Sequence, residues 1–154
     1  MIPTLNPFEV ARAEMGAWLH WSQKAAAALE PSLAHLVKIR ASILNGCANC
    51  INMHTREARR AGETEQRLYL LPAWQEAPVY SERERAALAW TDAVTLLATK
   101  GPPDETVHAA LAAQFSEAEQ VKLTLLINAI NGWNRLAVGF HLFASDSELD
   151  ALAA

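Results

Sequence analysis

Two cysteines and a histidine lie close together in the segment Asn45–His54. The chain has only two cysteines, Cys47 and Cys50, and His54 follows four residues after the second. If this segment is helical, residues spaced i, i+3 and i+7 share one face, so the three side chains line one stripe. A helix that starts at Cys47 presents unpaired N–H groups and a partial positive charge, which favour a thiolate over a thiol. His54 can then accept or relay the proton of Cys50.

This pattern is typical of a thiol redox cycle. A Cys50 thiolate that attacks a peroxide or a disulfide passes through a sulfenic acid or a mixed disulfide, and Cys47 can resolve either one. The same three residues could instead be inert core groups. Their shared stripe and the low cysteine content favour the redox role.

Composition restricts the class of protein. The chain has 154 residues, 51% of them hydrophobic, and a formal net charge of −4. This length predicts a single domain spanning 1–154 that folds without a disulfide staple. The negative charge gives no reason to expect nucleic acid or an anionic membrane as a partner. No leader or membrane span is recognisable, so we expect a cytoplasmic protein, and in that reducing compartment a close cysteine pair is more often catalytic or metal-binding than structural.

The elements that must position these residues are predicted to be helices only. No segment alternates with a period of two, and Pro, Gly and capping residues separate stretches of helical periodicity. We therefore predict an all-α helical bundle. The expected helices cover 7–29, 31–44, 47–61, 65–71, 81–99 and 104–113, with a long last helix from 116 that bends near Gly132 or Gly139.

Two stretches of the chain resemble a known family. Residues 29–62 resemble the core of the AhpD-like alkylhydroperoxidases in the carboxymuconolactone decarboxylase superfamily, whose pattern is Glu-x11-Cys-x-x-Cys-x-x-x-His on an all-helical fold. The run 127–136 (INAINGWNRL) is similar to a helix in the second half of that family. The resemblance touches most of the chain, but only the first motif is diagnostic of chemistry.

The resemblance implies a thiol-dependent peroxidase that reduces alkyl hydroperoxides in antioxidant defence. It implies that Cys50 is the attacking thiol, Cys47 its resolving partner and His54 the proton relay. It also implies a homo-oligomer, a trimer or a hexamer, that works beside a peroxiredoxin. Its electron donor would be a lipoylated or thioredoxin-like protein, and no cofactor is expected.

His35 departs from the family pattern. It occupies the position of the family glutamate, twelve residues before the first cysteine. A histidine there can accept a proton but brings no negative charge to balance an imidazolium. We keep His35 as a fourth candidate site residue, expected to face the stripe from the preceding helix. Asn49 likewise stands where the best-known branch of the family has a histidine.

Two alternative functions remain open. His35, Cys47, Cys50 and His54 together form a Cys2His2 set, which suits tetrahedral zinc in a structural or regulatory module. A γ-lactone decarboxylase or isomerase on the same fold would not need the cysteines at all. The five tryptophans, Trp133 beside Asn134 and Arg135 among them, are expected to be core or interface anchors.

Overall fold

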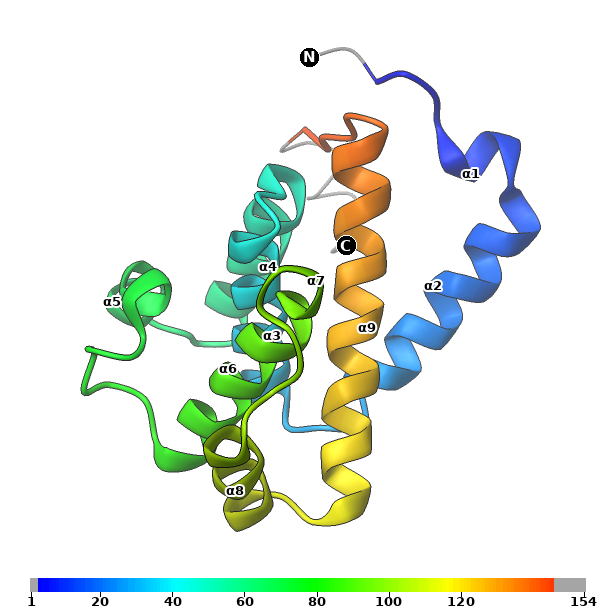
Figure 1. Cartoon of the computed structure of the whole chain (residues 1–154). Coiled ribbons are helices and arrows are strands. Elements are labelled where there is room, and N and C mark those ends of the chain that lie inside the picture. Colours follow the sequence, from blue (N-terminus) through cyan, green and yellow to red (C-terminus); the bar gives the residue numbers. More distant parts are fainter. Residues whose placement is uncertain (1–2, 146–154) are drawn as a thin grey trace.

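The fold is a bundle of helices (Figure 1), and the computed structural model describes residues 3–145. Within that range every regular element is helical, as the sequence predicts. The elements are α1 (Pro7–Val10), α2 (Arg12–Ala26), α3 (Pro31–Leu44), α4 (Ala48–Arg60), α5 (Glu65–Leu70), the 3-10 helix η1 (Leu71–Ala73), α6 (Glu82–Thr95), α7 (Leu97–Lys100), α8 (Glu105–Gln114) and α9 (Glu117–Gly139).

Local capping explains where several of these helices begin. Ser81 and Ser116 each form a full capping box with the glutamate three residues later, which satisfies free N–H groups at the starts of α6 and α9. Two predicted helices are interrupted. The backbone leaves the helical conformation at Ala11, which separates α1 from α2, and at Leu96, which separates α6 from α7.

α3 lies at the centre of the bundle, against α4, α6 and α9. Leu36, Val37 and Ile39 on α3 are at most 1% exposed and contribute to two apolar clusters, one toward α6, α8 and α9 and one toward α4 and α6. Arg40 of α3 also donates two hydrogen bonds to Asp92 of α6, at 2.6 and 2.8 Å. These contacts fix the helix that precedes the cysteines.

α2 packs against α9, on the opposite side of α9 from α4 (Figure 1). The two helices meet at Gly132, where a Cβ atom would lie 2.5 Å from the indole of Trp18. Trp133 is an anchor, as predicted: its ring stacks on Phe8, and its Nε1 donates to Ser22 Oγ at 2.9 Å.

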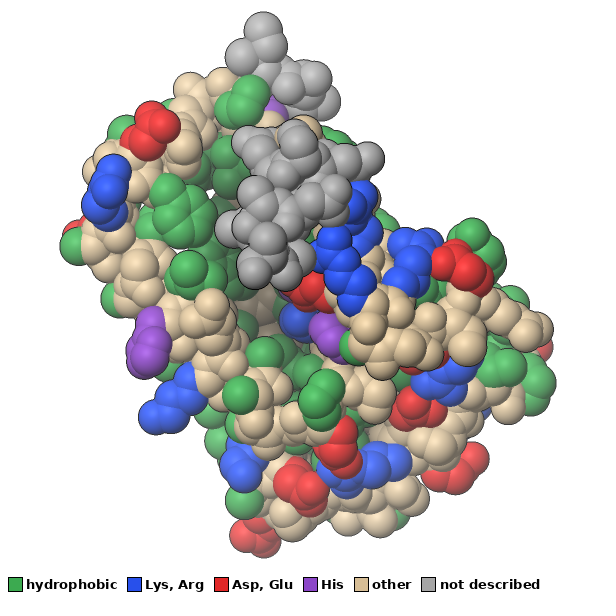
Figure 2. Space-filling model, turned by 180° about the vertical axis from the view of Figure 1, so that it is seen from behind, with side chains coloured by type: hydrophobic (Ala, Val, Ile, Leu, Met, Phe, Trp, Pro, Cys, Tyr) green, Lys and Arg blue, Asp and Glu red, His purple; other side chains and the backbone are tan. Residues whose placement is uncertain are grey.

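No helix in the described part of the chain has the length and apolar character needed to cross a membrane. Acidic and basic side chains are mixed over the lower half of the face in Figure 2. Several ion pairs join acidic and basic side chains of the protein, such as Arg83 with both Glu30 and Glu119.

Candidate functional site

Cys47 lies at the first turn of α4, as its spacing predicts. Its sulfur caps the helix, accepting a hydrogen bond from the backbone N–H of Cys50 at 3.3 Å. Gly46 makes the sharp turn before it with a φ of +65°, a conformation that glycine adopts without strain. The backbone N–H of Cys47 donates to Ser42 O at 2.9 Å. The end of α3 therefore sets the position of the first sulfur.

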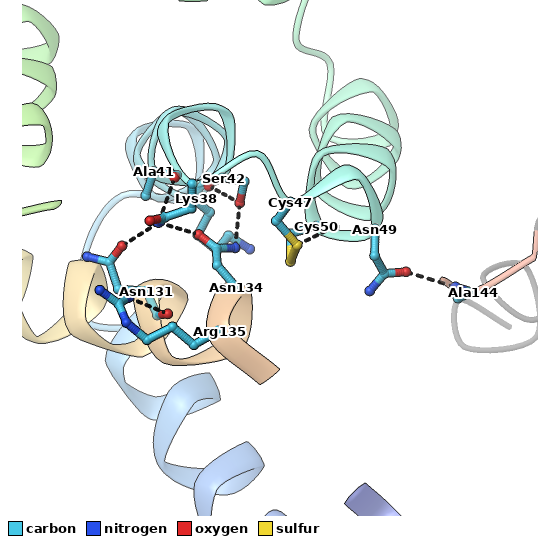
Figure 3. Close-up of a disulfide and its surroundings, with 11 residues drawn as sticks. Lys38, Ala41, Ser42, Cys47, Asn49, Cys50, Asn131, Asn134, Arg135 and Ala144 are labelled. Atoms are coloured by element: carbon cyan, nitrogen blue, oxygen red, sulfur yellow. Dashed lines mark hydrogen bonds between the residues drawn. A yellow bond between two sulfur atoms is a disulfide. The ribbon is translucent and has the colours of Figure 1, made fainter. Parts of the chain in front are cut away.

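Cys47 and Cys50 are joined by a disulfide (Figure 3). Both residues are buried, with exposed fractions of 1% and 2%. They lie in an apolar cluster with Ala41 of α3 and Ile130 of α9. The sulfur pair is thus enclosed between α3, α4 and α9.

Three asparagine side chains hold the turn before Cys47 against α9, and Figure 3 shows the two on α9, Asn131 and Asn134. The Asn45 amide donates to Asn131 Oδ1 at 2.7 Å and to Asn134 Oδ1 at 2.9 Å. Asn134 in turn donates to Ser42 Oγ at 3.0 Å. Asn134 is 1% exposed, Asn131 is buried and Asn45 is half-buried, so this amide cluster is a largely buried hydrogen-bond network that positions the cysteine turn.

The segment after α9 contacts the cysteine cluster and α4. Leu142 packs against the cluster that contains both cysteines. Asn49, the residue between the cysteines that the family pattern singled out, accepts a hydrogen bond from the backbone N–H of Ala144 at 2.8 Å (Figure 3). A side chain of α4 therefore tethers this segment.

His54 lies one turn beyond Cys50 on α4 and is 7% exposed. Its Nδ1 is 2.7 Å from Oε2 of Glu57, three residues further along the same helix. Lys38 of α3 donates to the same carboxylate oxygen at 3.3 Å. The partner of the imidazole is therefore a carboxylate on α4 itself, with a lysine from α3 beside it.

His35 is half-buried on α3. Within residues 3–145 its Nδ1 is buried without a hydrogen-bond partner, and it forms no hydrogen bond with His54. The residue that contacts the His54 imidazole is therefore Glu57 and not His35. Glu57 and the amide cluster are the site residues that sequence reasoning missed, although the His-x-x-Glu spacing at i, i+3 on a predicted helix was a usable signal for Glu57.

The site shifts the pKa values of its titratable groups. Burial lowers the pKa of His54 below its ordinary value, partly opposed by its hydrogen bond to Glu57, while Lys38 lowers it further. Burial raises the pKa of Glu57, but the hydrogen bond and charge of His54 and the charge of Lys38 outweigh it and bring this pKa to about 2. Burial and the charge of Lys38 lower the pKa of His35. Burial thus favours the neutral form of His54, while its contacts favour the ionised form of Glu57.

The described residues do not assemble the alternative zinc set. Among residues 3–145 no group of three or more His, Cys, Asp or Glu side chains is placed to hold a metal ion. An open hollow of about 380 Å³ lies elsewhere, between α6, α8 and α9, and is lined by residues such as Trp90, His108 and Thr124. It shares no residue with the disulfide site.

The chemistry available at the site follows from these contacts. A thiolate on Cys47 would receive the N–H of Cys50 and the positive end of α4, and a thiolate on Cys50 would lie one helical turn from His54. Two sulfurs already bonded to each other can take up and release two electrons as a pair. The arrangement is suited to thiol–disulfide chemistry assisted by a base.

Fold and site together define an all-α protein with a Cys-x-x-Cys pair at a helix start. The model of the carboxymuconolactone decarboxylase family matches residues 12–93, more than half of the chain. The chain belongs to this family, and the AhpD-like class predicted from its motif is confirmed.

Related proteins agree with this assignment. YdfG of Bacillus subtilis (strain 168), an uncharacterised protein, is 50% identical over 103 residues, which cover 67% of this chain and 69% of YdfG. A solved structure from Agrobacterium tumefaciens, of a protein of unknown function described as a candidate antioxidant defence protein AhpD, is 41% identical. Its TM-score is 0.89, and the match covers 94% of this chain and 100% of that one. An uncharacterised peroxidase-related protein from Silicibacter sp. TM1040 shares the fold, with 16% identity, a TM-score of 0.75 and coverage of 87% of this chain and 71% of its own.

Proposed function

We propose that this protein is a thiol-dependent oxidoreductase that reduces alkyl hydroperoxides through Cys50 and Cys47 in antioxidant defence. The observation that carries the proposal is the buried Cys47–Cys50 disulfide at the start of α4, one turn from His54. The resemblance to AhpD-like proteins supports a hydroperoxide as the substrate, and we include a cytoplasmic location in the proposal.

The proposed cycle has three steps. The Cys50 thiolate, its proton taken up by His54, attacks the terminal oxygen of the peroxide; the O–O bond breaks, and the alkoxide leaves as an alcohol with a proton from His54. The Cys47 thiol then attacks the sulfur of the Cys50 sulfenic acid, so the disulfide forms and water leaves. A dithiol donor, thioredoxin-like or lipoylated, returns two electrons and two protons. We include a peroxiredoxin and a homo-oligomeric assembly in this proposal.

Intact mass of the reduced protein after one equivalent of an alkyl hydroperoxide tests the proposal. The wild type is expected to lose two hydrogens, and Cys47→Ser is expected to gain one oxygen as a sulfenic acid at Cys50, which dimedone would trap. If both thiols remain reduced at neutral pH under this treatment, the peroxidase proposal is wrong.

The same preparation separates the two alternative functions. Stoichiometric zinc in protein purified without chelator would favour the Cys2His2 module over the redox site. A γ-lactone decarboxylase would retain its activity when both cysteines are changed to serine, whereas the proposed oxidoreductase would lose it.

A further inference from the structure

The contacts of His54 distinguish this site from the pattern that its sequence resembles. The family pattern supplies a carboxylate from the helix before the cysteines, where this chain has His35. Here the carboxylate comes from Glu57 on α4, 2.7 Å from Nδ1 of His54, and the preceding helix supplies Lys38 instead, 3.3 Å from Glu57 Oε2.

We propose that Glu57, held by Lys38, is the positioning residue of His54 and fixes the tautomer in which Nδ1 carries the proton. The inference rests on the proposed thiol redox function and deepens it. Glu57 touches no reacting atom, so it acts through the imidazole alone.

Hydrogen-bond chemistry explains why this contact selects one tautomer. An ionised carboxylate can only accept, so Nδ1 of a neutral His54 must donate to it. The proton is then absent from Nε2, whose lone pair is free to accept the proton of the Cys50 thiol. When His54 becomes an imidazolium, the same carboxylate stabilises the new charge.

Lys38 completes the arrangement from α3. Its side chain is 15% exposed and lies against a carboxylate that is itself 40% exposed, so the pair is only partly screened by water. Lys38 keeps Glu57 ionised and limits how strongly it draws a proton onto His54. Within the described range 3–145, the charged and titratable groups that act on His54 are Glu57 on its own helix and Lys38 and His35 on α3. Within that same range α9 faces the cysteine turn with the neutral amides of Asn131 and Asn134.

A simple field effect of Glu57 and a positioning role predict opposite changes in the pKa of the Cys50 thiol. If Glu57 were only a nearby negative charge, its removal would make the Cys50 thiolate easier to form and lower the thiol pKa. If it acts by orienting and charging His54, its removal weakens the base and the imidazolium, and the thiol pKa rises. The sign of the change therefore separates positioning from a simple field effect.

The test compares Glu57→Gln with the matched variant Glu65→Gln. Glu65 is an exposed glutamate that forms an ion pair with Arg59, so this control also removes one charge. Both are measured on reduced protein carrying Cys47→Ser, so that Cys50 is the only thiol. In Glu57→Gln we expect the thiol pKa to rise by about one unit, with alkylation of Cys50 by iodoacetamide at neutral pH slowed roughly tenfold. Glu65→Gln is expected to leave both unchanged. An unchanged or lowered thiol pKa in Glu57→Gln would overturn the inference.

Nitrogen NMR of labelled His54 gives a readout that a purely structural role would not move. We expect Nε2 to be unprotonated in the wild type and in Lys38→Met, and a mixture of tautomers in Glu57→Gln. Lys38→Met keeps the contact between Glu57 and His54, so it tests the tautomer even if Glu57→Gln does not fold. A mixture of tautomers in the wild type would refute the proposal.

A double-mutant comparison shows whether Glu57 acts through the imidazole. In a His54→Ala background, Glu57→Gln is expected to cause no further slowing; an equal slowing in both backgrounds would contradict the positioning role. Failure of the proposed function is distinguishable from failure of this inference. If the wild type does not react with hydroperoxides, His54 would still show the single tautomer by NMR, and Glu57→Gln would still raise the thiol pKa of Cys50.

Discussion

At the scale of single residues, the site depends on which side chain orients His54. The family pattern predicts a carboxylate at position 35, where this chain has a histidine. The structure shows that a different residue makes the contact: Glu57 lies 2.7 Å from the imidazole, while Nδ1 of His35 has no partner within residues 3–145. The carboxylate expected at position 35 is therefore supplied by Glu57 of α4.

The lowered pKa of Glu57 predicts a specific dependence of stability on pH. This pKa falls from 4.5 to about 2 on folding, so the ionised contact stabilises the protein above pH 4.5 and loses its effect as the pH falls toward 2. Urea unfolding should show that wild type exceeds Glu57→Gln by about 1–2 kcal/mol near neutral pH, a figure reduced for solvent screening of a partly exposed group. The difference should shrink below pH 4.5 and vanish only below about pH 2. A constant difference over this range would contradict the assignment.

At the scale of elements, most helices follow from local signals. Capping boxes at Ser81 and Ser116, and the spacing of Cys47, Cys50 and His54, are all readable within a few residues. What the sequence did not disclose depends on packing between helices. The amide cluster, the contact of Lys38 with Glu57 and the tether of Asn49 join residues between 19 and 95 positions apart. No local pattern specifies such pairs.

The close approach of α2 and α9 predicts opposite effects for two glycine substitutions. Gly132→Ala places a Cβ 2.5 Å from the Trp18 ring, so we expect a loss of about 1–3 kcal/mol in unfolding free energy. Gly16→Ala, within α2, meets nothing within 4 Å and should gain about 0.5–1 kcal/mol from helix propensity. Thermal and urea denaturation measure both. Equal effects of the two changes would show that the helices do not meet at Gly132.

The amide cluster predicts a second pair of effects on α9. Asn134→Leu removes the donor to Ser42 and one acceptor of Asn45 from a buried network, and should cost about 1–3 kcal/mol of stability. Asn128→Leu, on the exposed side of the same helix, is the control and should change stability by less than about 0.5 kcal/mol. Because the network fixes the turn before Cys47, we also expect slower disulfide formation in Asn134→Leu, measured by intact mass over time.

At the scale of the whole molecule, the disulfide site lies where three helices meet. α3 provides the turn and Lys38, α4 the sulfurs and His54, and α9 the amides. The family and the all-α bundle could be predicted from the sequence because one motif and helical periodicity suffice for them.

Assembly into a trimer or hexamer stays a prediction, which sedimentation velocity of the purified protein checks.

Reduction of the disulfide is expected to depend on the segment that follows α9. A thiol reductant must reach a sulfur atom of residues that are only 1–2% exposed, and Leu142 and Ala144 lie against this site. Stopped-flow reduction by dithiothreitol should therefore approach a plateau as its concentration rises. Asn49→Ala should raise that plateau roughly two- to tenfold by removing one hydrogen bond, and Asn52→Ala on the same helix should not. A linear rise without a plateau would contradict this.

If the plateau is observed, the tether at Asn49 makes reduction of this disulfide a gated process. Turnover would have a ceiling set by how often the polypeptide opens, whatever the supply of reductant. The rate with each reductant would then depend on how well that reductant displaces the segment after α9 as well as on its redox potential.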